Sequence, residues 1–121
     1  MLLYEDITEK IIRAFYEVHN ELGSGLLEKV YERALIIELK NQGLKVENQK
    51  PLKVFYKGNE VGDYFSDLVV EDKIIIEIKS SSGLVNENLS QLINYLKITK
   101  LKLGFLVNFG KIGRAHVWTP V

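Results

Sequence analysis

The stretch from residue 65 to residue 79 decides the fold, and it reads Phe-Ser-Asp-Leu-Val-Val-Glu-Asp-Lys-Ile-Ile-Ile-Glu-Ile-Lys. Two apolar runs of strand length flank the polar pair Glu71 and Asp72, a pattern that predicts two antiparallel strands. The second strand is expected over Lys73 to Lys79. Its run of three isoleucines predicts a strand that is covered on both faces, near the middle of a sheet.

Glu77 and Lys79 lie at the end of this second strand. Because side chains alternate along a strand, Glu77 and Lys79 share one face and Ile78 points to the other. The register of the hairpin decides whether Asp67 joins them. A two-residue loop would pair Asp67 with Ile76, on the wrong face, whereas a three-residue loop or one bulge pairs it with Glu77. We predict the second register.

Asp67 and Glu77 would then place two carboxylates at cross-strand distance. Like charges this close repel each other unless a cation lies between them or one carboxylate keeps its proton. A hard divalent ion with oxygen ligands relieves the repulsion, and Mg²⁺ or Mn²⁺ suits such a site. Taken without Asp67, the pair Glu77 and Lys79 also fits a salt-bridge ladder on a solvated face.

Upstream of the strands, apolar residues recur at helical spacing in two segments. The first helix is expected from about Ile7 to Glu21, with Asp6 and Glu9 spaced as a capping box. The second helix is expected to open at Ser24-Gly25 and to stop at Gly43. Since the connection between them is short, the two helices should pack as an antiparallel pair.

Between the helices and the central strand, the apolar period changes to two. Leu52 to Tyr56 alternates and predicts a strand, and Pro51 confines its start to a sheet edge or a bulge. Gly58-Asn59 is a hairpin signal, which leads into the strand expected over Glu60 to Val70.

A third helix and a fourth strand complete the predicted fold. Asn86 is expected to cap the helix, and the strand covers about Leu103 to Asn108. A strand–helix–strand unit makes this strand parallel to the strand at 73–79. The sequence therefore predicts an α/β fold of order α-α-β-β-β-α-β, with a four-stranded mixed sheet flanked by helices.

Composition narrows the class of protein. The chain has 121 residues, which is one domain by length, and no cysteine, so disulfides and thiolate zinc sites are excluded and a cytoplasmic location fits. The formal net charge is zero, and any contact with nucleic acid must come from local patches. No apolar run reaches membrane-spanning length, and the acidic start is not a signal peptide, so no membrane partner is expected.

The tail from Lys111 to Val121 follows neither period. It resembles the translation of a sequencing adapter in which an in-frame TGA is read as Trp118. We hypothesise that 111–121 is an unstructured artefact and that 1–110 is a domain truncated at its C-terminal end, so the native sequence after Gly110 is missing. Resequencing the locus and finding the tail intact would refute this hypothesis.

Asp67 followed by Glu77-Ile78-Lys79 resembles the pattern of the PD-(D/E)xK nuclease superfamily. The proline that often precedes the aspartate is replaced by Ser66. This resemblance implies a core like that of restriction endonucleases, with a metal site on the two central strands.

Two further motifs strengthen the resemblance. The segment Gly25-Leu-Leu-Glu-Lys-Val-Tyr31 matches the GxxExxY signature of a bacterial family within that superfamily, and Gln91-Leu-Ile-Asn-Tyr95 matches its QxxxY helix motif. The resemblance covers essentially residues 5–110.

The resemblance also implies roles for the site residues. Asp67 and Glu77 would hold Mg²⁺ or Mn²⁺, with the Ile78 carbonyl and Glu28 as further ligands. The ion would activate a water molecule. Lys79 would orient that water or neutralise the transition state.

The remaining motif residues are open to simpler interpretations. Gln91 and Tyr95, four apart on one helix, would position a phosphate or the site lysine. Tyr95 and Tyr31 also fit core aromatic residues with hydroxyls at the surface, and Glu28 also fits a helix-start charge. His19 is expected to be a packing or capping residue and not a catalytic one.

The predicted function is a metal-dependent phosphodiesterase, with DNA favoured over RNA as substrate. The first alternative is a catalytically silent module that binds nucleic acid or protein on a nuclease-like scaffold. The second is a purely structural or partner-regulating protein. Because a 13.9 kDa chain offers little surface for specific recognition, a homodimer or a protein partner is expected.

Overall fold

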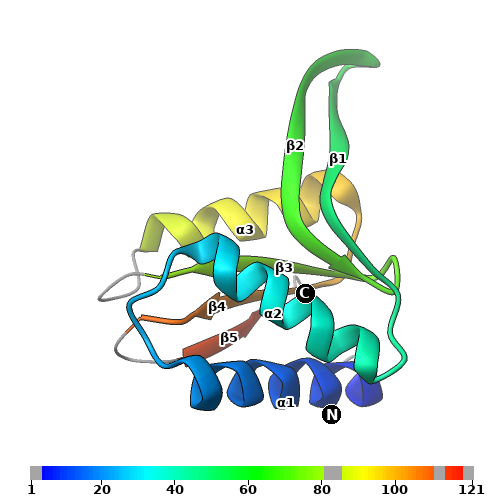
Figure 1. Cartoon of the computed structure of the whole chain (residues 1–121). Coiled ribbons are helices and arrows are strands. Elements are labelled where there is room, and N and C mark those ends of the chain that lie inside the picture. Colours follow the sequence, from blue (N-terminus) through cyan, green and yellow to red (C-terminus); the bar gives the residue numbers. More distant parts are fainter. Residues whose placement is uncertain (1–3, 81–85, 111–113, 119–121) are drawn as a thin grey trace.

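Five strands and three helices form an α/β fold in this computed structural model, which describes residues 4–80, 86–110 and 114–118. The elements are α1 (Glu5–Leu22), α2 (Glu28–Asn41), β1 (Val46–Tyr56), β2 (Asn59–Val70), β3 (Ile74–Lys79), α3 (Asn86–Thr99), β4 (Leu103–Asn108) and β5 (Arg114–Trp118). The mixed sheet has the order β1-β2-β3-β4-β5, with β3 and β4 parallel. Helices α1 and α2 cover one face and α3 covers the other (Figure 1).

The predicted element order and the central position of β3 are confirmed. The expected four strands are one too few, because Arg114–Trp118, in the segment predicted to be unstructured, pairs antiparallel with β4. A sheet edge can recruit an extended segment through backbone hydrogen bonds alone, so the sequence needs no periodic pattern there. The adapter origin of residues 111–121 stays a prediction.

The helix starts differ from the predictions. Helix α1 begins at Glu5, and Tyr4 before it has a left-handed backbone (φ 53°) and no side-chain cap bond, so the predicted capping box of Asp6 and Glu9 is wrong. Helix α2 begins at Glu28 and not at Ser24, and Gly25 in the connection has φ 99°. Such a φ is incompatible with a helical start, which delays the helix.

Strands β1 and β2 form a long hairpin that projects from the body of the molecule (Figure 1). Pro51 lies in the edge strand β1, as predicted, but the strand starts at Val46 and not at Leu52. The turn residues are Lys57 and Gly58, with φ values of 49° and 80°, one position earlier than the expected turn. Two positive φ values are typical of the type I′ turn that matches strand twist.

The loop between β2 and β3 has three residues, because Val70 pairs with Ile74. This is the predicted odd register, and its pairing runs as far as Leu68↔Ile76, one position before Asp67 and Glu77. Glu71 lies in this loop and has a left-handed backbone (φ 53°).

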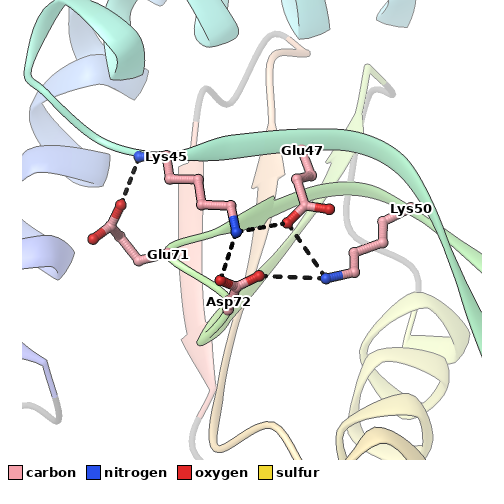
Figure 2. A network of polar contacts seen from close by, with 5 residues as sticks. All are labelled: Lys45, Glu47, Lys50, Glu71 and Asp72. Atoms are coloured by element: carbon pink, nitrogen blue, oxygen red, sulfur yellow. Dashed lines mark hydrogen bonds and ion pairs between the residues drawn. The ribbon is translucent and has the colours of Figure 1, made fainter.

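A network of five polar residues holds this loop against the start of β1 (Figure 2). The Lys45 N–H donates to Glu71 Oε2 at 2.6 Å, and the Lys45 ammonium lies 2.8 Å from Asp72 Oδ2. Lys50 contacts both Asp72 (3.3 Å) and Glu47 (3.4 Å). Hydrogen bonding to Lys45 is the main cause that lowers the pKa of Asp72 to about 2. The network therefore holds the loop that sets the register against the start of β1.

Two apolar layers enclose the sheet. On the α1/α2 side, the Tyr31 ring stacks on Phe109 with centroids 4.3 Å apart, and Phe15 lies 4.7 Å from Phe109. On the α3 side, Leu92 and Leu96 belong to a smaller buried cluster. None of the helices in the described ranges is long and apolar enough to cross a bilayer.

Candidate functional site

The candidate site lies where β2 and β3 separate. Their pairing runs from Val70↔Ile74 to Leu68↔Ile76. At the next position, the Oδ2 atom of the half-buried Asp67 accepts a hydrogen bond from the Ile78 N–H at 2.8 Å. The Asp67 carboxylate thus takes the place of a strand partner at the carboxyl end of β3.

Glu77 is the second carboxylate of the site. Its Oε1 accepts a hydrogen bond from the Tyr64 hydroxyl. Burial, and then the charge of Asp67, raise the pKa of Glu77 to about 8, and a side-chain hydrogen bond to Asp67 acts in the same direction. Burial also raises the pKa of Tyr64, so its hydroxyl stays protonated. The proton that Glu77 keeps relieves its repulsion from the Asp67 charge, as expected when two acids lie close together.

The raised pKa of Glu77 makes stability depend on pH. The folded pKa of about 8 exceeds the ordinary 4.5, so the folded state binds the proton more tightly than the unfolded state. In buffer with a chelator, the free energy of unfolding should fall as pH rises from about 5 to 8, by at most about 1.4 kcal/mol per pH unit. Urea titrations across this range measure the slope. Glu77→Gln should flatten it, and a slope that survives this substitution contradicts the assignment.

Glu28 lines the same pocket as Asp67, and the charge of Lys79 acts on both Glu28 and Glu77. Ser80 Oγ donates to the Leu26 carbonyl at 3.0 Å, which ties the end of β3 to the segment before α2. The pKa of Glu28 is raised by partial burial, lowered by the charge of Lys79 and raised by that of Asp67. Glu28 therefore lies within electrostatic reach of both residues, although it is far from them in sequence.

Gln91 and Tyr95 approach the site from α3. The exposed Gln91 donates from Nε2 to the Tyr95 hydroxyl at 3.2 Å. The Tyr95 ring stacks on Tyr64, with centroids 3.4 Å apart and planes 9° apart. The structure thus connects the QxxxY residues to Glu77 through Tyr64.

The family model described as the PD-(D/E)XK nuclease superfamily matches residues 5–119. The chain belongs to this superfamily. It is similar to the solved structure titled "Crystal structure of SSO0001", with a TM-score of 0.61 and 19% sequence identity, over 95% of this chain and 67% of that chain. At this identity the likeness concerns the fold. Comparison with curated proteins gives no significant match.

In this PD-(D/E)XK protein, Tyr31 serves the core. Its ring is fully buried, its hydroxyl donates to the Gly23 carbonyl at 2.7 Å, and the hydroxyl oxygen accepts the Leu26 N–H at 3.1 Å. Tyr31 therefore fastens the loop before α2, and its hydroxyl lies inside the protein and not at the surface. His19 stacks on Phe15 at 5.9 Å, as expected of a packing residue.

Tyr31→Phe is expected to lower the free energy of unfolding by about 1–3 kcal/mol, because two backbone groups lose a buried partner. Urea denaturation measures the change. The matched control is Tyr16→Phe in α1, where the tyrosine is 49% exposed. Equal stabilities of the two variants would contradict the proposed fastening role.

The sequence did not predict three residues around the site carboxylates: Tyr64 bonds Glu77, Gln49 bonds Asp67, and Glu32 bonds Gln49. Tyr64 lies three residues before Asp67, so strict alternation predicts opposite faces. The sequence does indicate where Glu32 lies, because Glu28, Glu32 and the buried Leu35 are spaced to share one face of α2. Gln49 has a left-handed backbone (φ 51°) that its sequence context does not indicate.

Asp67 and Glu77 are the candidate ligands for a metal ion. Within the described part of the chain, no group of three or more acidic or histidine side chains gathers closely enough to hold an ion unaided. Mg²⁺ needs less, because it keeps several waters and commonly binds through one or two carboxylates. The two carboxyl groups of Asp67 and Glu77, which interact electrostatically, therefore fit a hydrated divalent ion and not a closed protein cage.

Proposed function

We propose that this PD-(D/E)XK protein is a metal-dependent nuclease of the GxxExxY group that hydrolyses phosphodiester bonds, with DNA favoured over RNA. The observation that carries the proposal is the adjacent pair Asp67 and Glu77, with Lys79 acting electrostatically on Glu77. The absence of cysteine supports a cytoplasmic location, and the small size of the chain supports a homodimer or a protein partner.

Asp67 and Glu77 would hold Mg²⁺ or Mn²⁺, and the Ile78 carbonyl and Glu28 would supply further oxygen atoms. The ion, when bound, supplies an acidified water and neutralises charge on the scissile phosphate. Because Glu77 holds a proton near neutral pH, ion binding should release it.

The protein's own residues would orient the reaction. Lys79 brings a fixed positive charge toward the developing charge on the phosphate. Tyr64 orients the Glu77 carboxylate through its hydroxyl. Tyr95 supports the Tyr64 ring by stacking. The exposed Gln91 would contact a phosphate at the rim of the site.

A catalytically silent module that binds nucleic acid or protein is the second candidate. The observation that favours it is the proton on Glu77, which already relieves the repulsion from Asp67. Isothermal titration calorimetry with Mn²⁺ separates the two candidates, because the silent module requires no ion at the carboxylates.

Cleavage assays test the nuclease directly. Purified protein is incubated with single- and double-stranded DNA and RNA, with and without Mg²⁺ or Mn²⁺. Cleavage of DNA that requires the ion and is lost in Asp67→Ala supports the proposal. The control is Asp63→Ala, which removes an exposed carboxylate from the same strand. Cleavage that survives Asp67→Ala would come from a contaminant and would contradict the proposal.

A further inference from the structure

Both oxygens of the Asp67 carboxylate are held by donors from different strands. Oδ2 accepts the Ile78 N–H of β3 at 2.8 Å, and Oδ1 accepts Nε2 of Gln49 from β1 at 3.4 Å. Two such donors restrict rotation of the carboxylate. The direction in which Asp67 presents its remaining lone pairs is thereby fixed.

The Gln49 amide is itself anchored by a buried acid. Its Nε2 also donates to Glu32 Oε1 at 2.9 Å, and Glu32 is only 4% exposed. The other Glu32 oxygen pairs with the Lys29 ammonium at 3.0 Å. An amide nitrogen carries two hydrogens, so one can serve each carboxylate. The amide oxygen would be repelled by both, so only this orientation is stable.

The backbone of Gln49 departs from the strand to make these contacts. Asn48 pairs with Leu68 and Lys50 with Ser66, but Gln49 between them has φ 51°. A left-handed backbone costs a non-glycine residue about 1–2 kcal/mol. Residues in such conformations persist where the surroundings hold them and cluster at functional sites. Here the strain places the amide between Glu32 and Asp67, in a pocket that Glu28 and Ile78 also line.

We propose that Gln49 is a positioning residue for Asp67, that Glu32 anchors it, and that the two set the affinity of the site for a divalent cation. This inference rests on the proposed function, because it assumes that Asp67 is a metal ligand. Groups that orient metal ligands typically change metal affinity by about 10- to 100-fold when they are removed.

Calorimetric titration with Mn²⁺ alone tests the inference, with thermal unfolding measured for every variant. Gln49→Gly should weaken binding about tenfold or more. The melting temperature should change little, because relief of the strain at φ 51° offsets the loss of the hydrogen bond to Glu32. Glu32→Ala should also weaken binding. Glu32→Gln should bind Mn²⁺ nearly as well as the wild type does, since its amide oxygen can still accept the hydrogen bond from Gln49. Asn48→Ala, an exposed neighbour in β1, is the control and should bind as the wild type does.

Three other outcomes would contradict the positioning role of Gln49 and Glu32. If the wild-type protein binds no Mn²⁺, the proposed metal site and this inference both fail. If it binds Mn²⁺ and Gln49→Gly binds equally well, only the inference fails. If Gln49→Gly loses affinity together with melting temperature and Glu32→Gln does not restore binding, the two residues are structural, and the positioning role is again excluded.

Discussion

Lys79→Met is expected to lower the rate of metal-dependent DNA cleavage by about 100- to 1,000-fold while the fold is retained. The substitution keeps the length of the side chain and removes its charge. Losing one preorganised donor at a developing charge typically costs a factor of this size. The charge of Lys79 acts on Glu28 and Glu77, two carboxyl groups of the proposed site. Single-turnover rates at saturating Mn²⁺ measure the effect without a contribution from product release.

Lys97→Met is the matched control, because this exposed lysine lies in the last turn of α3. Its cleavage rate should stay close to that of the wild type. If Lys79→Met also stays within roughly tenfold of the wild type, the charge of Lys79 does not stabilise the transition state to the extent proposed.

The second large effect is on stability. Phe109→Ala should lower the free energy of unfolding by about 3–5 kcal/mol, the usual cost of truncating a buried phenylalanine. Phe109 is fully buried and contacts three aromatic rings, those of Tyr31, Phe15 and His19. Its N–H also donates to the Lys79 carbonyl at 2.8 Å, so this packing supports the end of β3. Urea denaturation monitored by circular dichroism measures the loss.

Phe55→Ala provides the comparison, because Phe55 on the projecting hairpin is 60% exposed. It should change stability by less than about 0.5 kcal/mol. A loss below about 1 kcal/mol for Phe109→Ala would contradict the conclusion that the packing of Phe109 supports the core and the end of β3.

The sequence predicted most of the fold because the decisive patterns are local. The isoleucine run Ile74-Ile75-Ile76 indicated a central strand, and β3 is the third strand of five. Pro51 indicated an edge, and β1 is an edge strand. By contrast, β5 at Arg114–Trp118 depends on backbone pairing with β4, which leaves no period in the sequence.

The sequence predicted the part of the candidate site that depends on strand register. The three-residue loop gives the predicted register, and the pairing ends at Leu68↔Ile76, one position before Asp67 and Glu77. The residues that hold these carboxylates were not predictable in the same way. Tyr64 reaches Glu77 because β2 and β3 separate beyond the Leu68↔Ile76 pair, and alternation fails there. Gln49 reaches Asp67 through a left-handed backbone, which is a tertiary effect and not a local preference.

A crystal structure of the protein soaked with Mn²⁺ tests most directly whether Asp67 and Glu77 bind a divalent ion. Anomalous density between the carboxylates of Asp67 and Glu77, with the Tyr64 hydroxyl still on Glu77, is the predicted result. The contradictory result is a map with no anomalous peak at these two side chains and the Lys79 ammonium seated between them.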